Sequence, residues 1–510
     1  MTNSSQFDYY GSINVSYTKS FGRHLVQGIV GGELKETNSE SDAYKTVGFL
    51  DDPLGYPSYA VQFDSYTGPS GSSSISRSAG MFANFNYSWD NRYLIDLTGR
   101  IDGSSNFASK QRSAPFWSAG VRWNIYNEKF MKTHGWFENL AVRANIGTVG
   151  NQNFQLSQIM TLYNFLKMYD GVMGAEIMSI ANPELKWQTT LNRNIGLEFS
   201  LLQGLVNLDF NYYSNITKNN LTDIAILPST GFSTYKANMG KVRNQGYEFS
   251  LSITPIKKNG WIVNAFVNGA HNKNKLLNIS DALRDYNEVI KENQTAHLNY
   301  AGYTQLERIF LFEEGQSLNS IFAVRSMGID PGTGQEIFVT ADGVQTFQWN
   351  AADQVVVGNT EPTLKGYFGL NVDYKRWSFG ANFQYSFGAD RYNKTLYEKI
   401  EGGNFAQNAD RRALTQRWTK PGDVAKYRGY GNTSQLKPTS RFVQKDDFLS
   451  MTSARLSYTL NANDLQSLGI SLLKFTLSTN DLFYVSTIKQ ERGLSYPFAR
   501  TFYFSLQANF

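Results

Sequence analysis

Residues 501–510 read TFYFSLQANF and alternate between two kinds of side chain. The apolar set comprises Phe502, Phe504, Leu506, Ala508 and Phe510, and the intervening residues are polar or amphipathic. Because successive side chains of a strand point to opposite faces, this pattern predicts a β-strand with one apolar and one polar face. The same alternation recurs at 83–89, 195–201, 206–212, 247–253, 366–374, 379–387 and 454–460. The chain is therefore expected to be all-β.

The stretches between the predicted strands alternate between short and long. Short turns are expected at 21–23, 90–91, 203–204, 257–260 and 375–376, with a longer one at 127–136. Long polar loops are expected at 37–76, 148–186, 218–237, 274–304, 388–446 and 485–497. This alternation is typical of an outer-membrane barrel, which has short periplasmic turns and long extracellular loops.

We therefore predict a transmembrane antiparallel β-barrel located in the outer membrane. The pattern gives about 14 strands, or about 16 if two more lie between 305 and 345. If the short turns are periplasmic, the last strand runs downward and Phe510 lies on the periplasmic side.

The composition excludes several other classes of protein. Of the 510 residues, 18% are charged and 15% are aromatic, and the formal net charge is +5. The absence of Cys excludes a disulfide scaffold, a thiolate zinc site and an iron–sulfur cluster. No apolar run is long enough for a transmembrane helix. The mild charge balance gives no reason to expect a nucleic-acid partner. The predicted barrel makes outer-membrane lipids the expected surroundings.

Aromatic residues gather at the ends of the predicted strands, for example Tyr17, Trp89, Tyr93 and Trp261. Rings with a polar edge suit the interface between membrane and water. A soluble β-sandwich that binds carbohydrate would also explain alternating strands and Asn-rich loops. However, connections as long as 388–446 are unusual inside a compact soluble domain, which favours the barrel.

Residues that usually carry catalysis or bind metals are few. The four His residues, His24, His134, His271 and His297, are not spaced like metal ligands. No nucleophile-elbow, phosphate-loop or dinucleotide motif lies between a predicted strand and a helix. We predict a protein that is not an enzyme and has neither metal nor cofactor. A barrel enzyme with a catalytic site at its rim stays an alternative.

Ligand contacts are expected in long loops that contain aromatic residues, because sugars stack on such rings. The candidates are Tyr163, Phe165 and Tyr169 in one loop and Tyr392, Tyr397 and Trp418 in another. Packing of a loop on itself, or against a lid protein, would explain the same residues. Loop composition does not separate an oligosaccharide from a peptide substrate.

Several sequence blocks occur in a fixed order along the chain. The first is RIDGSSNF at 100–107, followed by Arg112, and the later blocks contain Asn151, Asn182, Pro183, Trp187, Gly246, Glu248, Asp330 and Pro331. Together they resemble the SusC/RagA family of TonB-linked outer-membrane transporters of Bacteroidota. We expect the block residues, which include Arg100, Asp102, Gly103, Ser104 and Ser105, to have structural roles. Arg100, Asp102 and Arg112 could form a lumenal ion-pair cluster, but Asp102-Gly103 is also a common turn dipeptide.

The resemblance implies import of oligosaccharides or peptides. It also implies a surface lipoprotein of the SusD type and the inner-membrane protein TonB as partners. Phe510 resembles the terminal aromatic residue that barrel-assembly machinery recognises. The family's barrel resembles the 22-stranded plugged transporters. Because the chain shows fewer strands and no plug-like segment, we expect residues 1–510 to be the C-terminal part of such a barrel, without its plug, and inactive alone.

Overall fold

The structure is a computed structural model of the whole chain. It describes all residues except 1, 50–55, 57–58, 65–69, 107–111, 132–135, 152–160, 170–171, 180–181, 183–184, 226–231, 233, 239, 293–310, 404–409, 433–435, 462–468 and 489–498. The chain forms two compact units, with unit 1 comprising Met1–Val121 and Asn145–Leu191, and unit 2 comprising Arg122–Ala144 and Asn192–Phe510.

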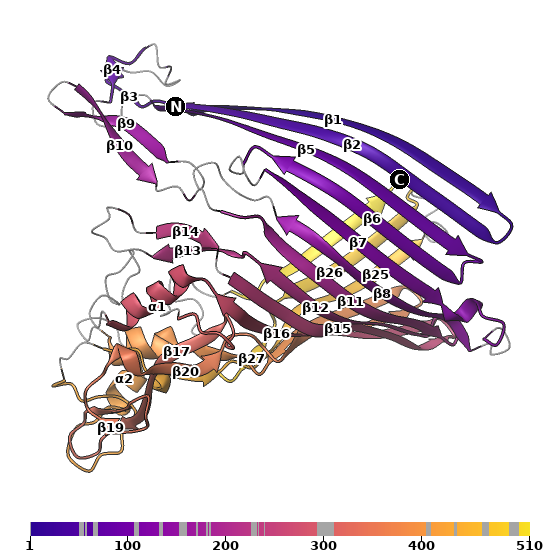
Figure 1. The fold of residues 1–510 in the computed structure, drawn as a ribbon. Coiled ribbons are helices and arrows are strands. Elements are labelled where there is room, and N and C mark those ends of the chain that lie inside the picture. Colours follow the sequence, from indigo (N-terminus) through magenta and orange to yellow (C-terminus); the bar gives the residue numbers. More distant parts are fainter. Residues whose placement is uncertain are drawn as a thin grey trace. The chain divides into compact units, whose positions relative to one another are not determined.

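Unit 1 is built from long antiparallel strands joined by tight turns (Figure 1). Its hydrogen-bonded order includes β1-β2-β5-β6. The strands are β1 (Thr2–Phe21), β2 (His24–Ala43), β5 (Ser70–Trp89) and β6 (Tyr93–Ser104), with the short pair β3 (Thr46–Val47) and β4 (Gln62–Phe63) and the hairpin β9 (Leu162–Tyr169) and β10 (Val172–Ser179). Both units contribute residues to β7 (Ser113–Asn124), β8 (Phe137–Asn151) and β11 (Gln188–Leu201).

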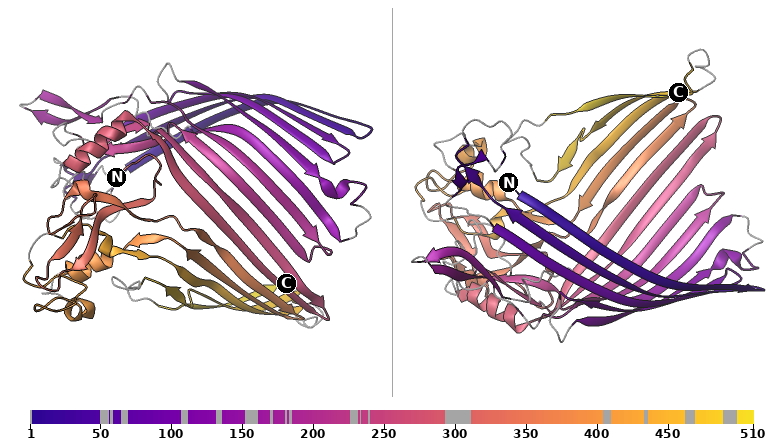
Figure 2. Two further views of the ribbon diagram at one scale, coloured as in Figure 1. Left: turned by 60° about the horizontal axis from the view of Figure 1, so that its bottom comes forward. Right: turned by 90° about the horizontal axis from the view of Figure 1, so that it is seen from above.

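Unit 2 contains a second run of antiparallel strands, which Figure 2 shows side by side. These wall strands pair in chain order. They are β12 (Val206–Lys218), β15 (Gly240–Lys258), β16 (Trp261–Ile279), β21 (Leu364–Tyr374), β22 (Trp377–Phe387), β25 (Phe448–Asn461), β26 (Leu472–Asn480) and β28 (Phe502–Asn509), with β27 (Tyr484–Ser486) beside β25.

The remaining elements of unit 2 lie in its long connections. The first groups are the hairpin β13 (Leu221–Ala225) and β14 (Thr234–Asn238) and the helix α1 (Asp281–Glu292). A small sheet has the order β19-β18-β17-β20, comprising β17 (Ser320–Ile329), β18 (Glu336–Val339), β19 (Gln345–Thr346) and β20 (Gln354–Asn359). The last connection contains β23 (Asp390–Tyr392), a π-helix (Thr395–Glu401), α2 (Arg411–Thr415) and β24 (Val443–Lys445). We call the described residues of 320–361 and 389–447 the loop module.

The short turns confirm the sequence prediction. Strand pairs close at Gly22, at Asp90-Asn91, at Leu202–Leu205, at Asn259-Gly260 and at Lys375-Arg376. Asn259 and Gly260 have φ values of 56° and 80°, and Asp90 and Asn91 have φ values of 53° and 51°. At Asn259-Gly260, left-handed residues at both central positions match the twist of a two-residue hairpin. The Asp90–Arg92 loop has three residues, and Asn and Asp tolerate the left-handed conformation there.

Three sequence predictions need correction. Strands β2 and β5 extend to Ala43 and from Ser70, so the loop expected at 37–76 is shorter. The two strands sought between 305 and 345 exist as β17 and β18, but they pair in the small sheet and not with the wall. Consecutive residues Ile321–Val324 are all buried, so β17 lacks the two-faced exposure of a wall strand. Asp102 and Gly103 lie in β6 opposite Gly80 and Ala79 and do not form a turn.

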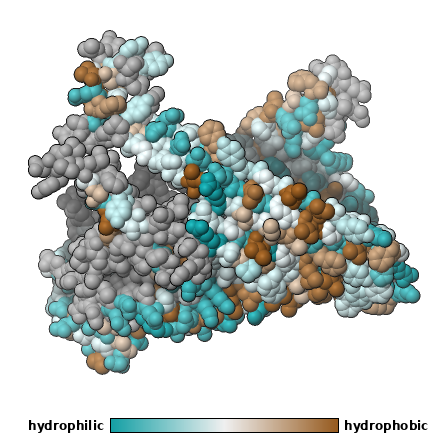
Figure 3. Space-filling view, turned by 45° about the horizontal axis from the view of Figure 1, so that its top comes forward, coloured by the Kyte–Doolittle hydropathy of each residue, from teal (hydrophilic) through white to brown (hydrophobic). Residues whose placement is uncertain are grey.

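The two faces of the sheet differ as alternation predicts. In unit 1, Ile13 and Met81 belong to one face and are 74% and 75% exposed. Exposed apolar residues are visible over the strands in the space-filling view (Figure 3). One buried hydrophobic cluster lies where a connection meets the wall strands: Leu283 of α1 packs with Val242 of β15 and with Leu276 and Ile279 of β16. No helix within the described residues is long and apolar enough to cross a membrane.

Candidate functional site

Neighbouring wall strands of unit 2 bring polar side chains into one row. Their register pairs Asp209 with Ser250, Ser250 with Asn268, Asn268 with Tyr367, and Tyr367 with Gln384. The residues one position away, Phe210, Phe249, Gly269, Gly366 and Tyr385, pair in a second row. Because side chains alternate, the two rows belong to opposite faces of the sheet.

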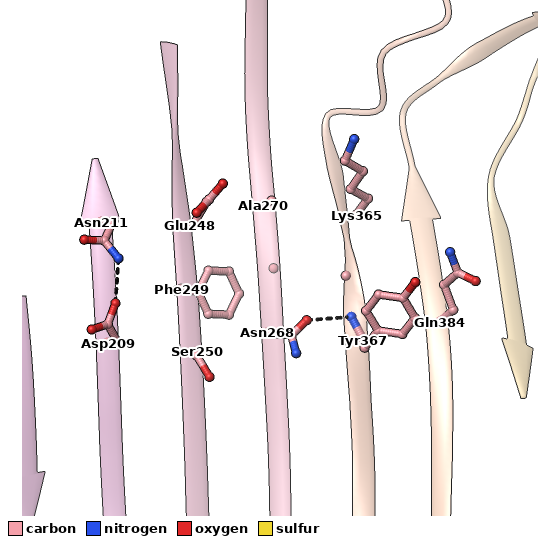
Figure 4. Close-up of a pocket in the computed structure, with 12 residues that line it drawn as sticks. Asp209, Asn211, Glu248, Phe249, Ser250, Asn268, Ala270, Lys365, Tyr367 and Gln384 are labelled. Carbon is pink, nitrogen blue, oxygen red and sulfur yellow. Dashed lines mark hydrogen bonds between the residues drawn. The ribbon is translucent and has the colours of Figure 1, made fainter. Parts of the chain in front are cut away.

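A pocket of about 460 Å³ lies along this row. Asp209 and Glu248 approach it from β12 and β15, whereas Lys365, Tyr367 and Gln384 come from β21 and β22 (Figure 4). The Asn268 side chain accepts a hydrogen bond from the Tyr367 backbone N–H at 3.0 Å and so ties β16 to β21. The pocket therefore combines acidic, basic and amide groups with an aromatic ring that is 46% exposed. Such a lining can hydrogen-bond and stack against a polar ligand.

An arginine network adjoins the pocket. Arg122 donates two hydrogen bonds to Glu198, at 3.0 and 2.7 Å. Arg143 pairs with Glu198 Oε1, which also accepts from Arg122, and with Asp209, where N and O are 3.2 Å apart. Within the described part of the chain, Glu248 makes no hydrogen bond or ion pair, in contrast to Asp209. Glu248 is thus the carboxylate of the pocket that is available to a ligand.

Two glycines make these close approaches possible. A Cβ on Gly196 would overlap the Arg143 side chain and the Asn211 amide. A Cβ on Gly246 would overlap the backbone carbonyl of His271 on the neighbouring strand. Any larger residue at either position would displace the network or the β15–β16 pairing.

Unit 1 has a separate ion-pair cluster. The Arg100 Nε donates to both carboxylate oxygens of Asp102, at 2.6 and 2.7 Å, and Arg100 also pairs with Glu33. Gly80 lies beneath, where a Cβ would meet the Asp102 carboxylate and the Arg100 guanidinium. The expected cluster thus includes Arg100 and Asp102. Arg112 contributes its backbone carbonyl, which accepts a 3.0 Å hydrogen bond from the Ser104 N–H.

Comparison with known proteins identifies the family. Residues 1–306 match the family described as TonB dependent receptor-like, beta-barrel. The chain belongs to this TonB-dependent receptor family. A TonB-dependent receptor of Formosa agariphila is 26% identical over 502 residues, covering 91% of this chain and 48% of that protein. SusC of Bacteroides thetaiotaomicron is 26% identical over 429 residues, covering 79% of this chain and 40% of SusC.

Solved structures confirm the barrel fold. The structure of the RagAB peptide transporter matches with a TM-score of 0.81 at 23% identity, covering 96% of this chain and 52% of that one. The RagAB peptide importer in its closed-closed state matches with a TM-score of 0.79 at 25% identity. The chain spans about half the length of the curated relatives it matches. The predicted resemblance to SusC and RagA is confirmed, and the soluble sandwich is set aside.

The block residues of this TonB-dependent receptor chain have visible packing roles. Trp187 is buried against Phe116, with ring centroids 5.8 Å apart, and Gly150 leaves room for the Phe116 ring. Asn182 is buried and Asn151 ends β8, whereas Pro183 lies outside the described residues. The Ser104 and Ser105 hydroxyls accept backbone N–H bonds from Asn106 and Arg77, at 3.2 and 2.9 Å.

The Asp330-Pro331 block organises a turn in the loop module. Asp330 accepts hydrogen bonds from the Thr333 hydroxyl at 2.6 Å and from the Gly332 and Thr333 backbone N–H groups. The Thr333 hydroxyl is the main cause of a lowered pKa of the Asp330 carboxyl. The Pro331 carbonyl accepts a 2.8 Å hydrogen bond from the Trp418 indole, which joins the two halves of the loop module.

The loop aromatics named as ligand candidates have different surroundings. Tyr397 is 3% exposed and packs with Phe442, Ile400 and Tyr427, and burial raises the pKa of its hydroxyl. Tyr392 contacts the same cluster, and Trp418 is half-buried over Gly334 and Gly429. Tyr163 is exposed on β9, where Phe165 and Tyr169 also lie. Ligand binding by these six residues stays a prediction.

Sequence reasoning missed the lumen-side pocket and the arginine network. A signal was present, since Arg122, Arg143, Glu198 and Asp209 are charged residues in the middle of alternating segments. Charges inside strands otherwise rich in apolar residues indicate a polar, protein-lined face. Over the described ranges, no group of three or more His, Asp and Glu side chains could hold a metal ion.

Proposed function

We propose that this chain forms part of the transmembrane wall of a TonB-dependent outer-membrane importer of the SusC/RagA type. The observation that carries the proposal is the contrast between the two faces of the sheet. In unit 2, the apolar face exposes residues such as Tyr212 and Phe379, which a lipid environment would cover. The opposite face contains ion pairs and the 460 Å³ pocket, which suits a water-filled lumen.

The proposed orientation places the short turns and the C-terminus in the periplasm. In unit 2, Asn461 pairs with Leu472, and Leu472 pairs with Asn509. Trp377, which follows the 375–376 turn, pairs with Tyr458 in the same part of β25. The end of β28 therefore lies at the edge of the sheet that carries the short turns. Phe510 is 91% exposed there, which leaves it accessible as a barrel-assembly signal.

The proposed cargo is an oligosaccharide or a peptide. The printed description of RagAB names it a peptide transporter, and SusC is among the relatives. The proposed partners are a SusD-like surface lipoprotein and TonB. We propose that TonB acts through the plug region of the receptor, which the strands described here do not include. The relatives are receptors and transporters, which supports a role without catalysis.

Membrane fractionation tests the placement. The expressed chain, or the full receptor that contains it, should sediment with outer membranes, resist urea extraction and dissolve only in detergent. Its electrophoretic mobility should change on heating, because a detergent-stable barrel migrates as a compact form until it is heated. Recovery of folded protein in detergent-free buffer would overturn the proposal.

Uptake measurements test the proposed lumenal pocket. In the full receptor, the double variant Glu248→Gln with Tyr367→Ala should lower uptake of its cargo by about tenfold. This factor corresponds to the binding free energy of roughly one hydrogen bond. Glu40→Gln, which neutralises an exposed carboxylate of unit 1, serves as the control and should leave uptake unchanged. Normal uptake by the double variant would exclude a role for the pocket in cargo passage.

A further inference from the structure

The outward face of three wall strands in unit 2 changes character along its length. Near the short turns it is apolar, with rows such as Leu208, Leu251 and Val267. Further along, Tyr212 pairs with Tyr247, and Tyr247 pairs with His271, which makes one aromatic row. The Tyr247 and His271 rings are 5.1 Å apart, and the Phe210 ring stacks below Tyr247. Such a row fits the boundary between lipid tails and headgroups.

Beyond the aromatic row, the same face becomes cationic. Two residues further along lies Lys273, and the next row pairs Arg243 with Lys275. The row after that pairs Lys218 with Lys241. We call these five residues the cationic rim. Arg193, two positions beyond the exposed Ile195 on β11, extends the same pattern.

The cationic rim lacks acidic partners on its own face. None of the outward positions of β11, β12, β15 and β16, all of which are described, is Asp or Glu. Glu361 and Asp390 line a pocket of about 430 Å³ together with Lys273 and Lys275. However, Glu361 already contacts Lys365 and Asn319, and Asp390 already pairs with Lys445 at 2.8 Å. The Arg243 Nε is buried and has no hydrogen-bond acceptor among the described residues.

The level of the rim corresponds to lipid headgroups. Each row advances about 7 Å along a strand, and less along the membrane normal because barrel strands are tilted. The headgroup region is about 5–8 Å deep on each side of a bilayer. The Lys273 row therefore falls within the headgroups, and the Arg243–Lys275 row falls at their outer boundary.

We propose that the cationic rim binds the phosphate groups of an anionic lipid in the outer leaflet. The proposal rests on the membrane placement proposed above. Lys and Arg side chains recognise phosphate oxygens by charge-assisted hydrogen bonds, and a cluster of them near a membrane surface attracts anionic lipid. The occupant is a lipid and not a free anion, because the apolar and aromatic rows directly below the cations would contact its acyl chains.

The corresponding face of unit 1 lacks this feature. There, the outward positions toward the long-loop end of β2 are Glu36, Asn38, Glu40 and Asp42. Arg77 of β5 is paired with Glu36 at 2.7 Å. Excess positive charge is therefore a property of the β12–β16 face and not of strand ends in general.

Lipid retention tests the proposal. The full receptor, purified in detergent, would be incubated with lipid A or with its dephosphorylated form and examined by native mass spectrometry. Wild type should retain the phosphorylated lipid, and Arg243→Gln/Lys273→Gln/Lys275→Gln, which removes the cations at the headgroup level, should retain about tenfold less. Lys257→Gln/Lys258→Gln, which removes two cations from the other end of β15, is the matched control and should match wild type. Inorganic phosphate at the same concentration should not compete.

Three results would overturn the inference. They are equal retention of both lipids, unchanged retention by the triple variant, and an equal loss in the control. Displacement by inorganic phosphate would assign the site to a free anion instead of a lipid. The proposed function is tested separately by fractionation. If the receptor stays in the outer membrane with normal heat-dependent mobility while retention fails, only the lipid site is wrong.

Discussion

In unit 2, the wall strands and the loop module bury their side chains in different places. Wall residues such as Tyr212 and Phe379 are 44% and 40% exposed, and the strands are connected chiefly by their backbone ladder. The loop module instead buries Ile400, Ala413 and Phe442 almost completely in a core of its own. The wall therefore depends on an apolar solvent around it, whereas the module has a buried apolar core of the kind found in water-soluble domains.

The module also buries paired charges. The Glu401 side chain is fully buried and accepts from Arg428 at 2.9 Å and from Arg441, which also contacts Glu336. Arg417 donates to the backbone carbonyls of Ile400 and Glu401, each at 2.6 Å. Such a network holds only while every member is paired.

The largest expected effect is the loss of Glu401. Glu401→Ala removes the buried carboxylate that Arg428 and Arg441 share and leaves Arg441 with Glu336, which should destabilise the module by about 3–5 kcal/mol. Hydrogen exchange read by mass spectrometry should show faster exchange in 389–447 and unchanged exchange in β21 and β22. Glu398→Ala, an exposed acid of the same π-helix, is the control. Equal loss of protection in the wall would show that the two regions are not independent.

A wall charge should matter less. Glu198→Gln removes the carboxylate that Arg122 and Arg143 share, but its side chain is 19% exposed, so water partly compensates. We expect a loss of about 1–3 kcal/mol. The temperature at which the compact electrophoretic form disappears should fall, with Glu138→Gln on β8 as the control. A variant as stable as wild type would mean that the arginine network does not stabilise the wall.

A single neutral hydrogen bond should have a smaller effect. Tyr385 donates its hydroxyl to the Asn268 carbonyl at 2.9 Å, above Gly269 and Gly366, which have no side chain to block it. Tyr385→Phe should cost about 0.5–1.5 kcal/mol, measured from the same mobility transition. Tyr367→Phe should cost less than this, because no hydrogen bond of its hydroxyl is seen among the described residues. A larger loss of stability in Tyr367→Phe than in Tyr385→Phe would contradict the hydrogen bond from Tyr385 to the Asn268 carbonyl.

The smallest effect is expected from pH at the Asp330 turn. The folded turn lowers the pKa of Asp330, because the carboxylate accepts from Thr333 and Gly332. This contribution is present above the ordinary Asp value near 4 and is lost as the pH falls through the lowered pKa. Amide exchange of 332–334, corrected for its intrinsic rate, should therefore accelerate on acidification. Asp330→Asn should abolish the dependence, and protection that grows in acid would refute it.

The wall could be predicted from sequence because its physics is local. Alternation marks each strand, and Asp90-Asn91 and Asn259-Gly260 mark where it reverses. The module was not predicted, because a strand buried on both faces, such as Ile321–Val324, lacks a periodic signal. The pocket was not predicted, because Asp209 and Gln384 are far apart in the chain and line one pocket only through the register of four successive strand pairings. Tyr397 shows that an aromatic loop residue can equally be core.

The chain-order pairing of the wall has a consequence for the rate of folding. β1 and β2 pair over all 20 residues of each strand without a shift, and most wall strands likewise meet their nearest neighbour in sequence. Such hairpins close short loops at little entropic cost and form quickly. β16–β21 and β22–β25 are exceptions, because β17–β20 lie between the first two strands in sequence, and β23, α2 and β24 lie between the second two. These two pairings close longer loops, so we expect them to form later than the hairpins.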